Sequence, residues 1–294
     1  MTGRYESHID TESLLAIDTH VHVEKGDDGH LALPQHLIDA ATRYFRASPD
    51  RPGIDEIAEY YRQRRIAAVV FTIDAGTTLS HQPNSVEEIV QGAIRHSDVL
   101  IPFGSVDPLT GPAAIARARW LHDDLGVRGF KFHPTVQGFD PSNERFWPLW
   151  EVLEEFGLPA IFHTGQTGIG AGLPGGDGLR LAYSHPMLLD SVAAHFPGWP
   201  IVMAHPSVPW QDEAIAVATH KTNVWIDLSG WSPKYIPETL IRQANSLLQD
   251  RILFGSDYPL LTPDRWLTDF AALDMKETVR PKITKLNAIR LLGL

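Results

Sequence analysis

Short apolar runs recur along this chain at fairly regular spacing. Eight of them are rich in β-branched residues and almost continuously apolar, which is typical of strands buried on both faces of a parallel sheet. These runs lie at 15–21, 67–73, 100–106, 127–132, 159–162, 200–204, 224–228 and 252–255. Each run therefore predicts one strand of a common sheet.

Amphipathic segments, each long enough for a crossover helix, lie between most of these strands. In one of them Ile54, Ile57, Ala58 and Tyr61 share a helical face. The segments are 54–65, 86–94, 113–125, 145–156, 187–196, 211–220 and 238–248, and 279–292 predicts a closing helix. Eight alternating units predict an α/β protein, a (β/α)₈ TIM barrel that forms a single domain over residues 1–294. A doubly wound open sheet is the alternative, but no Gly-x-Gly-x-x-Gly turn follows the first strand.

Three connections are longer than usual, and each follows the C-terminal end of a strand. They are an insertion at 24–53 with a predicted short helix at 34–45, a glycine-rich loop at 165–178, and a loop at 229–237. Barrel enzymes place their active sites on this face. Because surface loops also tolerate insertions readily, simple surface extensions remain the alternative.

Composition narrows the classes of partner and of site. The chain has 294 residues, a formal charge of −11 and no cysteine. Without a basic run, nucleic acid and anionic membranes are not expected partners, and without cysteine no thiolate site or disulfide forms. No run reaches the roughly 20 apolar residues of a membrane span, and no apolar signal segment opens the chain. We expect a cytoplasmic protein.

Polar side chains that bind metals or move protons end five of the eight predicted strands. They are His20 and His22, Lys131 and His133, His163, His205, and Asp257. Residues at i and i+2 of a strand point to the same face, so His20 and His22 project together. The ends of barrel strands meet at one mouth, which predicts that all of these groups become neighbours.

Imidazole nitrogen and carboxylate oxygen are the ligands that a divalent ion such as Zn²⁺ takes in proteins. Taken singly, each histidine is better explained by a hydrogen-bonded core or capping position. Lys131 has the alternative of pairing with a neighbouring acid, and Asp257 that of capping a turn. The recurrence at the ends of separate strands favours a metal-dependent enzyme.

With these residues in hand, the chain resembles the amidohydrolase superfamily. It is most similar to the metal-dependent branch that includes aminocarboxymuconate-semialdehyde decarboxylase and the resorcylate decarboxylases. The resemblance covers residues 17–294 and is carried by five motifs: Asp-Thr-His-Val-His at 18–22, Gly-Phe-Lys-Phe-His-Pro at 129–134, Phe-His-Thr-Gly at 162–165, Ala-His-Pro at 204–206 and Gly-Ser-Asp-Tyr-Pro at 255–259. It implies one divalent ion, Zn²⁺ or alternatively Mn²⁺, held by His20, His22, His163 and Asp257, with His205 as general acid and base.

A closer resemblance, to 4-hydroxyphenyl-β-ketoacyl-CoA hydrolases, lies in residues 129–138, 163–178 and 227–237. It implies hydrolysis of a carbon–carbon bond in an aryl β-ketoacyl-CoA by retro-Claisen cleavage, with His205, Asp257 and Lys131 as catalytic groups. The alternative is nonoxidative decarboxylation of a hydroxybenzoate or a related acid. A barrel that has lost catalysis is a third reading, disfavoured because every expected residue type of the metal site is present.

The resemblance also implies a small aromatic or acyl-thioester substrate and a homo-oligomer, a dimer or larger. We expect His133, Trp210, Trp231 and Tyr258 to bind the substrate, although packing explains each aromatic ring equally well. A strand-4 lysine is carboxylated and bridges two metals in other branches of the superfamily. Lys131 therefore leaves a binuclear site as the alternative to the mononuclear site that we prefer.

Overall fold

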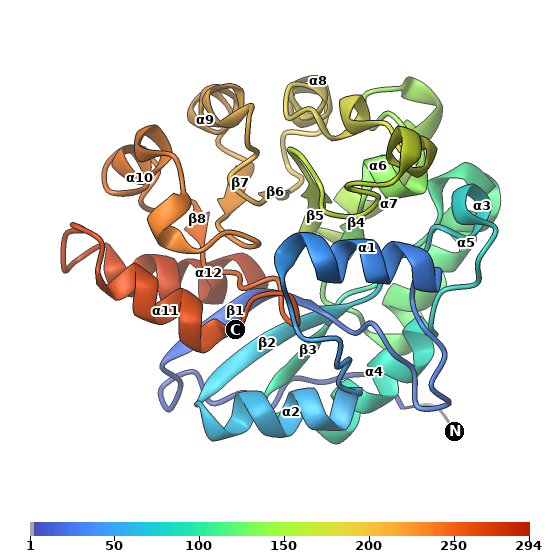
Figure 1. Ribbon diagram of the computed structural model, residues 1–294, viewed down its shortest axis with the longest axis horizontal. Helices are drawn as coiled ribbons and strands as arrows, with labels where there is room; N and C mark the ends of the chain where they lie inside the picture. Colours follow the sequence, from blue (N-terminus) through green and yellow to red (C-terminus); the bar gives the residue numbers. More distant parts are fainter. Residues whose placement is uncertain (1–2) are drawn as a thin grey trace.

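The computed structural model describes residues 3–294, so residues 1 and 2 of the predicted 1–294 domain lie outside the described part of the chain. Eight parallel strands follow one another around the molecule (Figure 1). Their bounds are β1 Ala16–His22, β2 Ile66–Phe71, β3 Leu100–Pro102, β4 Phe130–Phe132, β5 Ala160–His163, β6 Ile201–Ala204, β7 Val224–Asp227 and β8 Ile252–Leu253. The eight predicted strands are thus confirmed, most of them shorter than expected.

Hydrogen bonds close the strands into a barrel. Strands β1 to β3 pair in parallel, as do β4 to β8. The two groups are joined by a bridge between Gly104 and Phe130 on one side and by a bridge between Val21 and Tyr258 on the other. Closure leaves no open sheet edge, which distinguishes the barrel from the doubly wound alternative. Pairing beyond Pro102 is reduced to the single bridge at Gly104, which is why β3 ends before the predicted residue 106.

Helices surround the strands (Figure 1). Their bounds are α1 Gln35–Phe45, α2 Ile54–Gln63, α3 Gly76–Leu79, α4 Val86–Arg95, α5 Pro112–Trp120, α6 Pro134–Gln137, α7 Trp147–Phe156, α8 Leu188–His195, α9 Gln211–His220, α10 Glu238–Ala244, α11 Pro263–Ala271 and α12 Asn287–Leu292. Helix α11 is absent from the sequence predictions. Its signals were present, since Thr262 caps it by accepting from the backbone N–H of Arg265, and Trp266 and Phe270 form its buried face.

Alternation along the strands separates two apolar clusters. The larger one fills the space between the strands and the helices, and the smaller one contains residues such as Ile161 and Trp225. His163 lies two residues after Ile161 in β5, and Asp227 lies two residues after Trp225 in β7, so each shares the face of its apolar neighbour. The apolar floor of the barrel therefore carries a polar layer at the C-terminal ends of its strands.

Two of the predicted long connections cover this polar end. The 24–53 insertion contains helix α1, whose Ile38, Ala41 and Phe45 face a cavity at the barrel mouth, and the glycine-rich loop contributes residues 166–169 to the same cavity. The two segments touch, since Gln166 donates from Nε2 to the Tyr44 hydroxyl at 3.1 Å. Together they narrow the entrance to the site.

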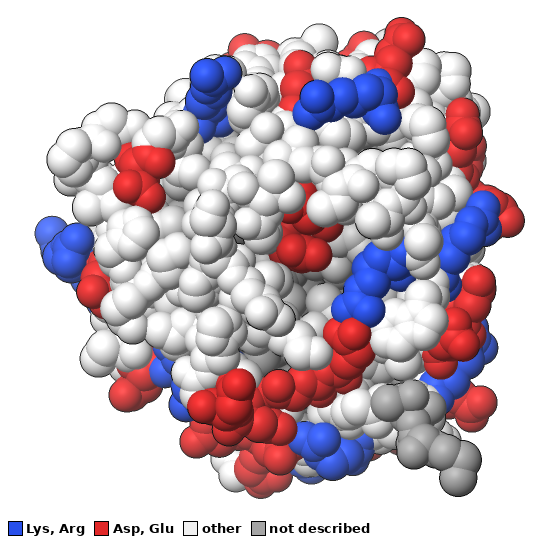
Figure 2. All heavy atoms as spheres, turned by 90° about the vertical axis from the view of Figure 1, so that its right-hand side faces the viewer, with Lys and Arg blue, Asp and Glu red and all other residues white. Residues whose placement is uncertain are grey.

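No broad basic patch appears on the face drawn in Figure 2, where acidic side chains gather along the lower edge. Among residues 3–294, no helix is both long and apolar enough to cross a membrane. The absence of nucleic-acid partners, the oligomeric state and the cellular location all stay predictions.

Candidate active site

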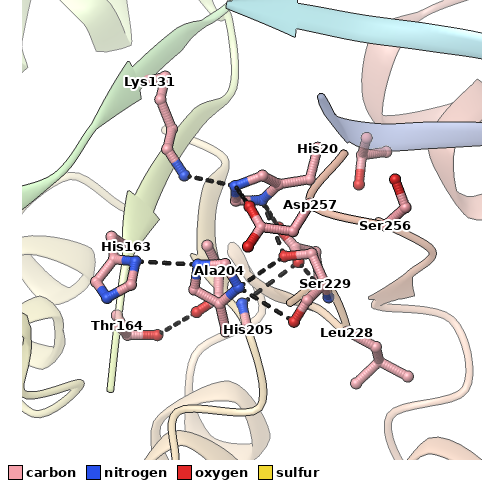
Figure 3. Close-up of polar contacts among 12 residues, drawn as sticks. His20, Lys131, His163, Thr164, Ala204, His205, Leu228, Ser229, Ser256 and Asp257 are labelled. Atoms are coloured by element: carbon pink, nitrogen blue, oxygen red, sulfur yellow. Dashed lines mark hydrogen bonds and ion pairs between the residues drawn. The ribbon is translucent and has the colours of Figure 1, made fainter. Parts of the chain in front are cut away.

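Three side chains from opposite ends of the chain bring donor atoms together at the barrel mouth. Two of them, His20 and Asp257, are labelled in Figure 3. The Nε2 atoms of His20 and His22 lie 3.3 Å apart, and Asp257 Oδ1 lies 3.4 Å from the first and 3.2 Å from the second. Ligands about 2.1 Å from a tetrahedral ion are separated by about 3.4 Å. Two imidazoles and one carboxylate at these distances fit a single divalent ion.

Asp227 fixes the ring of His20 in the orientation that this cluster requires. Its Oδ2 lies 2.9 Å from His20 Nδ1, and its Oδ1 accepts from the backbone N–H groups of His205 and Ser229. With Nδ1 donating to the carboxylate, the lone pair of Nε2 faces His22 and Asp257. Sequence reasoning missed Asp227, although an acid inside the apolar run 224–228 was a usable signal.

The charge states of these groups suit a metal site. Burial, with the nearby charge of Lys131, lowers the pKa of His20 to about 3, so its imidazole is neutral. Burial alone would raise the pKa of Asp257, but the hydrogen bond from His22 and the charge of His205 hold it below its usual range. A neutral imidazole and an ionised carboxylate are the forms that bind a cation.

His163 and His205 form a second pair beside this cluster. His163 Nδ1 lies 2.9 Å from His205 Nε2, and His205 Nδ1 lies 3.1 Å from the carbonyl oxygen of Ser229. Because a carbonyl only accepts, His205 donates from Nδ1, and its Nε2 accepts from His163. Burial lowers the pKa of both rings. Among the described residues, the groups whose possible ligand atoms all lie within 4.8 Å of one another are His20, His22 and Asp257, and His20, His205 and Asp227. His163 belongs to neither group.

Left-handed backbone marks two of the site residues. His205 has φ 69° and Asp257 has φ 71°, a region that costs a non-glycine residue about 1 kcal/mol or more and is concentrated at functional sites. Gly230, at φ 72°, lies close to both His205 and Asp257. A Cβ added at this glycine would lie 2.8 Å from His205 Nδ1 and 3.1 Å from Asp257 Oδ2. The loop after β7 thus packs against the site with no room for a side chain.

Lys131 lies at the site without lining the cavity. It is fully buried, and its Nζ is 3.0 Å from His20 Nε2. Burial lowers the pKa of Lys131 to about 8, while Asp227 and Asp257 act in the opposite direction. Its ammonium therefore stands beside the predicted ligand atoms, on the barrel side of them.

A cavity lies above these groups. Its wall is largely apolar and includes Ala32, Leu33, Ile38, Ala41, Phe45, Ile73, Ile169, Trp231 and Leu260. Of the predicted substrate-binding residues, His133 and Trp231 line it, and the His133 ring stacks on His163 with centroids 3.8 Å apart. The structure places Trp210 against His185 and Tyr258 against Tyr60, both outside the cavity wall.

The model of the amidohydrolase family matches residues 17–294, and the chain belongs to this family. Comparison with curated proteins finds no match. The expected membership of the amidohydrolase superfamily and the expected TIM-barrel fold are thereby confirmed.

Solved structures of similar fold cover almost the whole chain. An uncharacterized TIM-barrel protein of Bordetella bronchiseptica is 24% identical, with a TM-score of 0.78, over 95% of this chain and 98% of its own. A 2,6-dihydroxybenzoate decarboxylase from Rhizobium is 18% identical, with a TM-score of 0.68, over 95% and 99%. The 5-carboxyvanillate decarboxylase of Novosphingobium aromaticivorans, complexed with manganese and 4-hydroxy-3-methoxy-5-nitrobenzoic acid, is 16% identical, with a TM-score of 0.68, over all of both chains. At these identities the likeness establishes the fold.

Proposed function

We propose that this protein is a metal-dependent enzyme that decarboxylates a hydroxybenzoate-like aromatic acid without oxidation. One observation carries the proposal: His20, His22 and Asp257 stand together at a largely apolar cavity whose wall, among residues 3–294, contains no Lys or Arg. The carboxylate of an aromatic acid would then find its positive partner in a cation held by these three ligands, and the ring would pack on the apolar wall.

The similar structures support this choice of reaction. Two of them are decarboxylases of benzoic acids, and one holds manganese with a nitrobenzoic acid. We accordingly rank decarboxylation above the hydrolysis that the sequence resemblance implied. Mn²⁺ and Zn²⁺ both accept the nitrogen and oxygen donors present here.

His20, His22 and Asp257 would hold the ion, with His163 as the fourth ligand that the family resemblance implies. A bound divalent ion would supply positive charge for the carboxylate of the substrate. Loss of CO₂ breaks the bond between ring and carboxyl carbon, and the ring carbon must take up a proton. His205 lines the cavity and is held by Ser229, so it is our candidate for holding and delivering that proton.

Retro-Claisen hydrolysis of an aryl β-ketoacyl-CoA is the second candidate. One feature favours it: His205 and Asp257, which would take the proton from an attacking water, flank Gly230 closely in the same wall. Against it, the phosphates of CoA need cationic partners, and the described cavity wall provides none.

A paired assay separates the two reactions. The Mn²⁺- or Zn²⁺-loaded protein is mixed with a panel of hydroxybenzoates and, separately, with an aryl β-ketoacyl-CoA. Release of CO₂ with an equal amount of the phenol, lost in Asp257→Asn, is the expected result. If the CoA ester gives equal amounts of aromatic acid and acetyl-CoA and no benzoate releases CO₂, the proposal of decarboxylation is wrong and hydrolysis takes its place.

A further inference from the structure

Glu24 is a carboxylate in the cavity wall that neither the ligand set nor the proton transfer uses. Val23 still pairs with β2 through its N–H to Phe71 O at 2.9 Å, so the alternation of β1 continues past its end. Glu24 therefore follows His20 and His22 on the same side of the chain, and it lines the same cavity. We propose that Glu24, fixed by Arg51, is a specificity-determining residue that accepts a hydrogen bond from a hydroxyl group of the aromatic substrate.

Arg51 holds Glu24 in place. The Glu24 Oε2 atom is ion-paired with Arg51 Nε, and the side chains are 15% and 4% exposed. Arg51 also donates from Nη1 to the carbonyl oxygens of Ser48 and Asp50, at 2.7 and 3.1 Å, and from Nη2 to Thr42 Oγ1 at 2.6 Å. Both Nη atoms are hydrogen-bonded and Nε is ion-paired, so Arg51 is held in place and restrains the carboxylate beside it.

Stability alone is a weak reason for such a pair. Desolvation of two buried charges offsets most of their attraction, and well-packed apolar residues of similar volume commonly serve equally well. The cavity wall that contains Glu24 is largely apolar and includes Leu33, Ile38 and Ala41. A fixed carboxylate in such a wall is better explained by recognition of a polar group on the ligand.

The chemistry of that group follows from the charges around it. One carboxylate oxygen is engaged with Arg51, and a carboxylate can only accept hydrogen bonds. The partner must therefore be a donor, and a second substrate carboxylate would be repelled by both Glu24 and Asp257. A phenolic hydroxyl on the ring, with the acid group at the metal ligands, satisfies both conditions. This inference rests on the proposed function for the class of substrate.

Binding measurements test the inference without relying on turnover. Protein loaded with Mn²⁺ is titrated by calorimetry with each monohydroxybenzoate isomer and with the matching methoxybenzoate, which lacks the donor. The wild type is expected to bind at least one hydroxy isomer about tenfold more tightly than its methoxy partner, equivalent to about 1.4 kcal/mol. Glu24→Gln should bring this ratio within about threefold while metal content stays unchanged.

Matched variants separate recognition from folding. Asp39→Asn removes a negative charge from an exposed position of α1, in the same insertion but outside the cavity, and should keep the wild-type ratio. If Glu24→Gln folds poorly, the double variant Glu24→Met with Arg51→Met replaces the pair by apolar side chains and should also lose the preference. An unchanged ratio in either Glu24 variant, or no preference in the wild type, overturns the inference.

The same samples distinguish failure of this inference from failure of the proposed function. If the preference for a hydroxyl group depends on Glu24 but no benzoate releases CO₂, decarboxylation is refuted and the role of Glu24 stands. CO₂ release with equal binding of hydroxy and methoxy acids refutes the role of Glu24 and leaves decarboxylation intact.

Discussion

His20 Nδ1 lies 2.9 Å from Asp227 Oδ2, a contact between the first and the seventh strand of the barrel. It links residues 207 positions apart and turns His20 Nε2 toward His22 and Asp257. The predicted metal site therefore depends on an acid outside its three proposed ligands. The predictions below start from this cluster.

Removing a predicted ligand should remove the metal. We expect about one equivalent of divalent metal in the wild type, measured by elemental analysis after purification without added metal. His22→Ala and Asp257→Asn should each lower this content and abolish turnover, because each loses one of three donors. About two equivalents in the wild type would instead favour the binuclear alternative at Lys131, and full occupancy in Asp257→Asn would contradict its assignment as a ligand.

His205 should be needed for turnover but not for metal. We choose His205→Asn because asparagine adopts the left-handed backbone of this position, φ 69°, more readily than alanine. Loss of a general acid and base should lower kcat by about 100-fold or more. Metal content should equal that of the wild type, and a parallel loss of metal would assign His205 to the ligand set.

Asp227→Asn tests the orientation of His20. The substitution keeps the shape but gives the ring of His20 an uncharged partner. Loss of such a partner typically lowers metal affinity or activity by about 10- to 100-fold. Metal affinity is measured by competition with a chromogenic chelator. The control is Asp190→Asn, because Asp190 is a half-exposed residue paired with Lys221. Equal affinities in Asp227→Asn and wild type would show that the contact has no effect on the metal.

Gly230→Ala should damage the site more than the fold. The new Cβ would lie 2.8 Å from His205 Nδ1, so the histidine or the loop must move. Gly172→Ala is the matched control, since its φ of 78° carries similar backbone strain but nothing lies within 4 Å of the added Cβ. Both variants should lose about 1 kcal/mol of stability in urea unfolding, and only Gly230→Ala should lose activity, by about tenfold or more. Similar activities in the two variants would count against a role for this close approach.

The metal-free protein should become less stable in mild acid. Burial lowers the pKa of His20, His133, His163 and His205 below the ordinary 6.5. Below pH 6.5 these histidines bind protons in the unfolded chain but not in the folded chain. The stabilising contribution of the four histidines is therefore present above pH 6.5 and is lost as pH falls. Asp18 has the opposite sign, because burial raises its pKa from 3.8 to about 7, and stability from this group is lost as pH rises across that range.

Burial also raises the pKa of Glu24 and Asp74, which act with the sign of Asp18, so four histidines oppose three acids. Urea unfolding of chelator-treated protein should therefore show a free energy of unfolding that decreases between about pH 7 and about pH 5, with a slope of at most about 1.4 kcal/mol per pH unit for each proton. A free energy that is constant or rises over this interval would show that these rings are already charged in the folded state.

Local patterns predicted much of the fold and part of the site. Apolar runs located all eight strands, and the placing of His20, His22, Lys131, His163 and Asp257 at strand ends anticipated their convergence, because parallel strands of a barrel end at one mouth. Helix α11 was missed although its cap and buried face were readable. The side-chain roles at the site remain predictions for the experiments above.

The sequence by itself determined the barrel, through alternation of strand and helix patterns, and a set of metal-binding residue types at strand ends. Only the tertiary structure decided which of them approach one another, that Asp227 contacts His20 and that Arg51 pairs with Glu24. It also decided that Trp210 and Tyr258 lie outside the cavity wall. The physical reason is that periodicity along a strand fixes which face a side chain takes. Contacts between residues far apart in sequence depend on how the barrel closes and how its loops pack over the mouth.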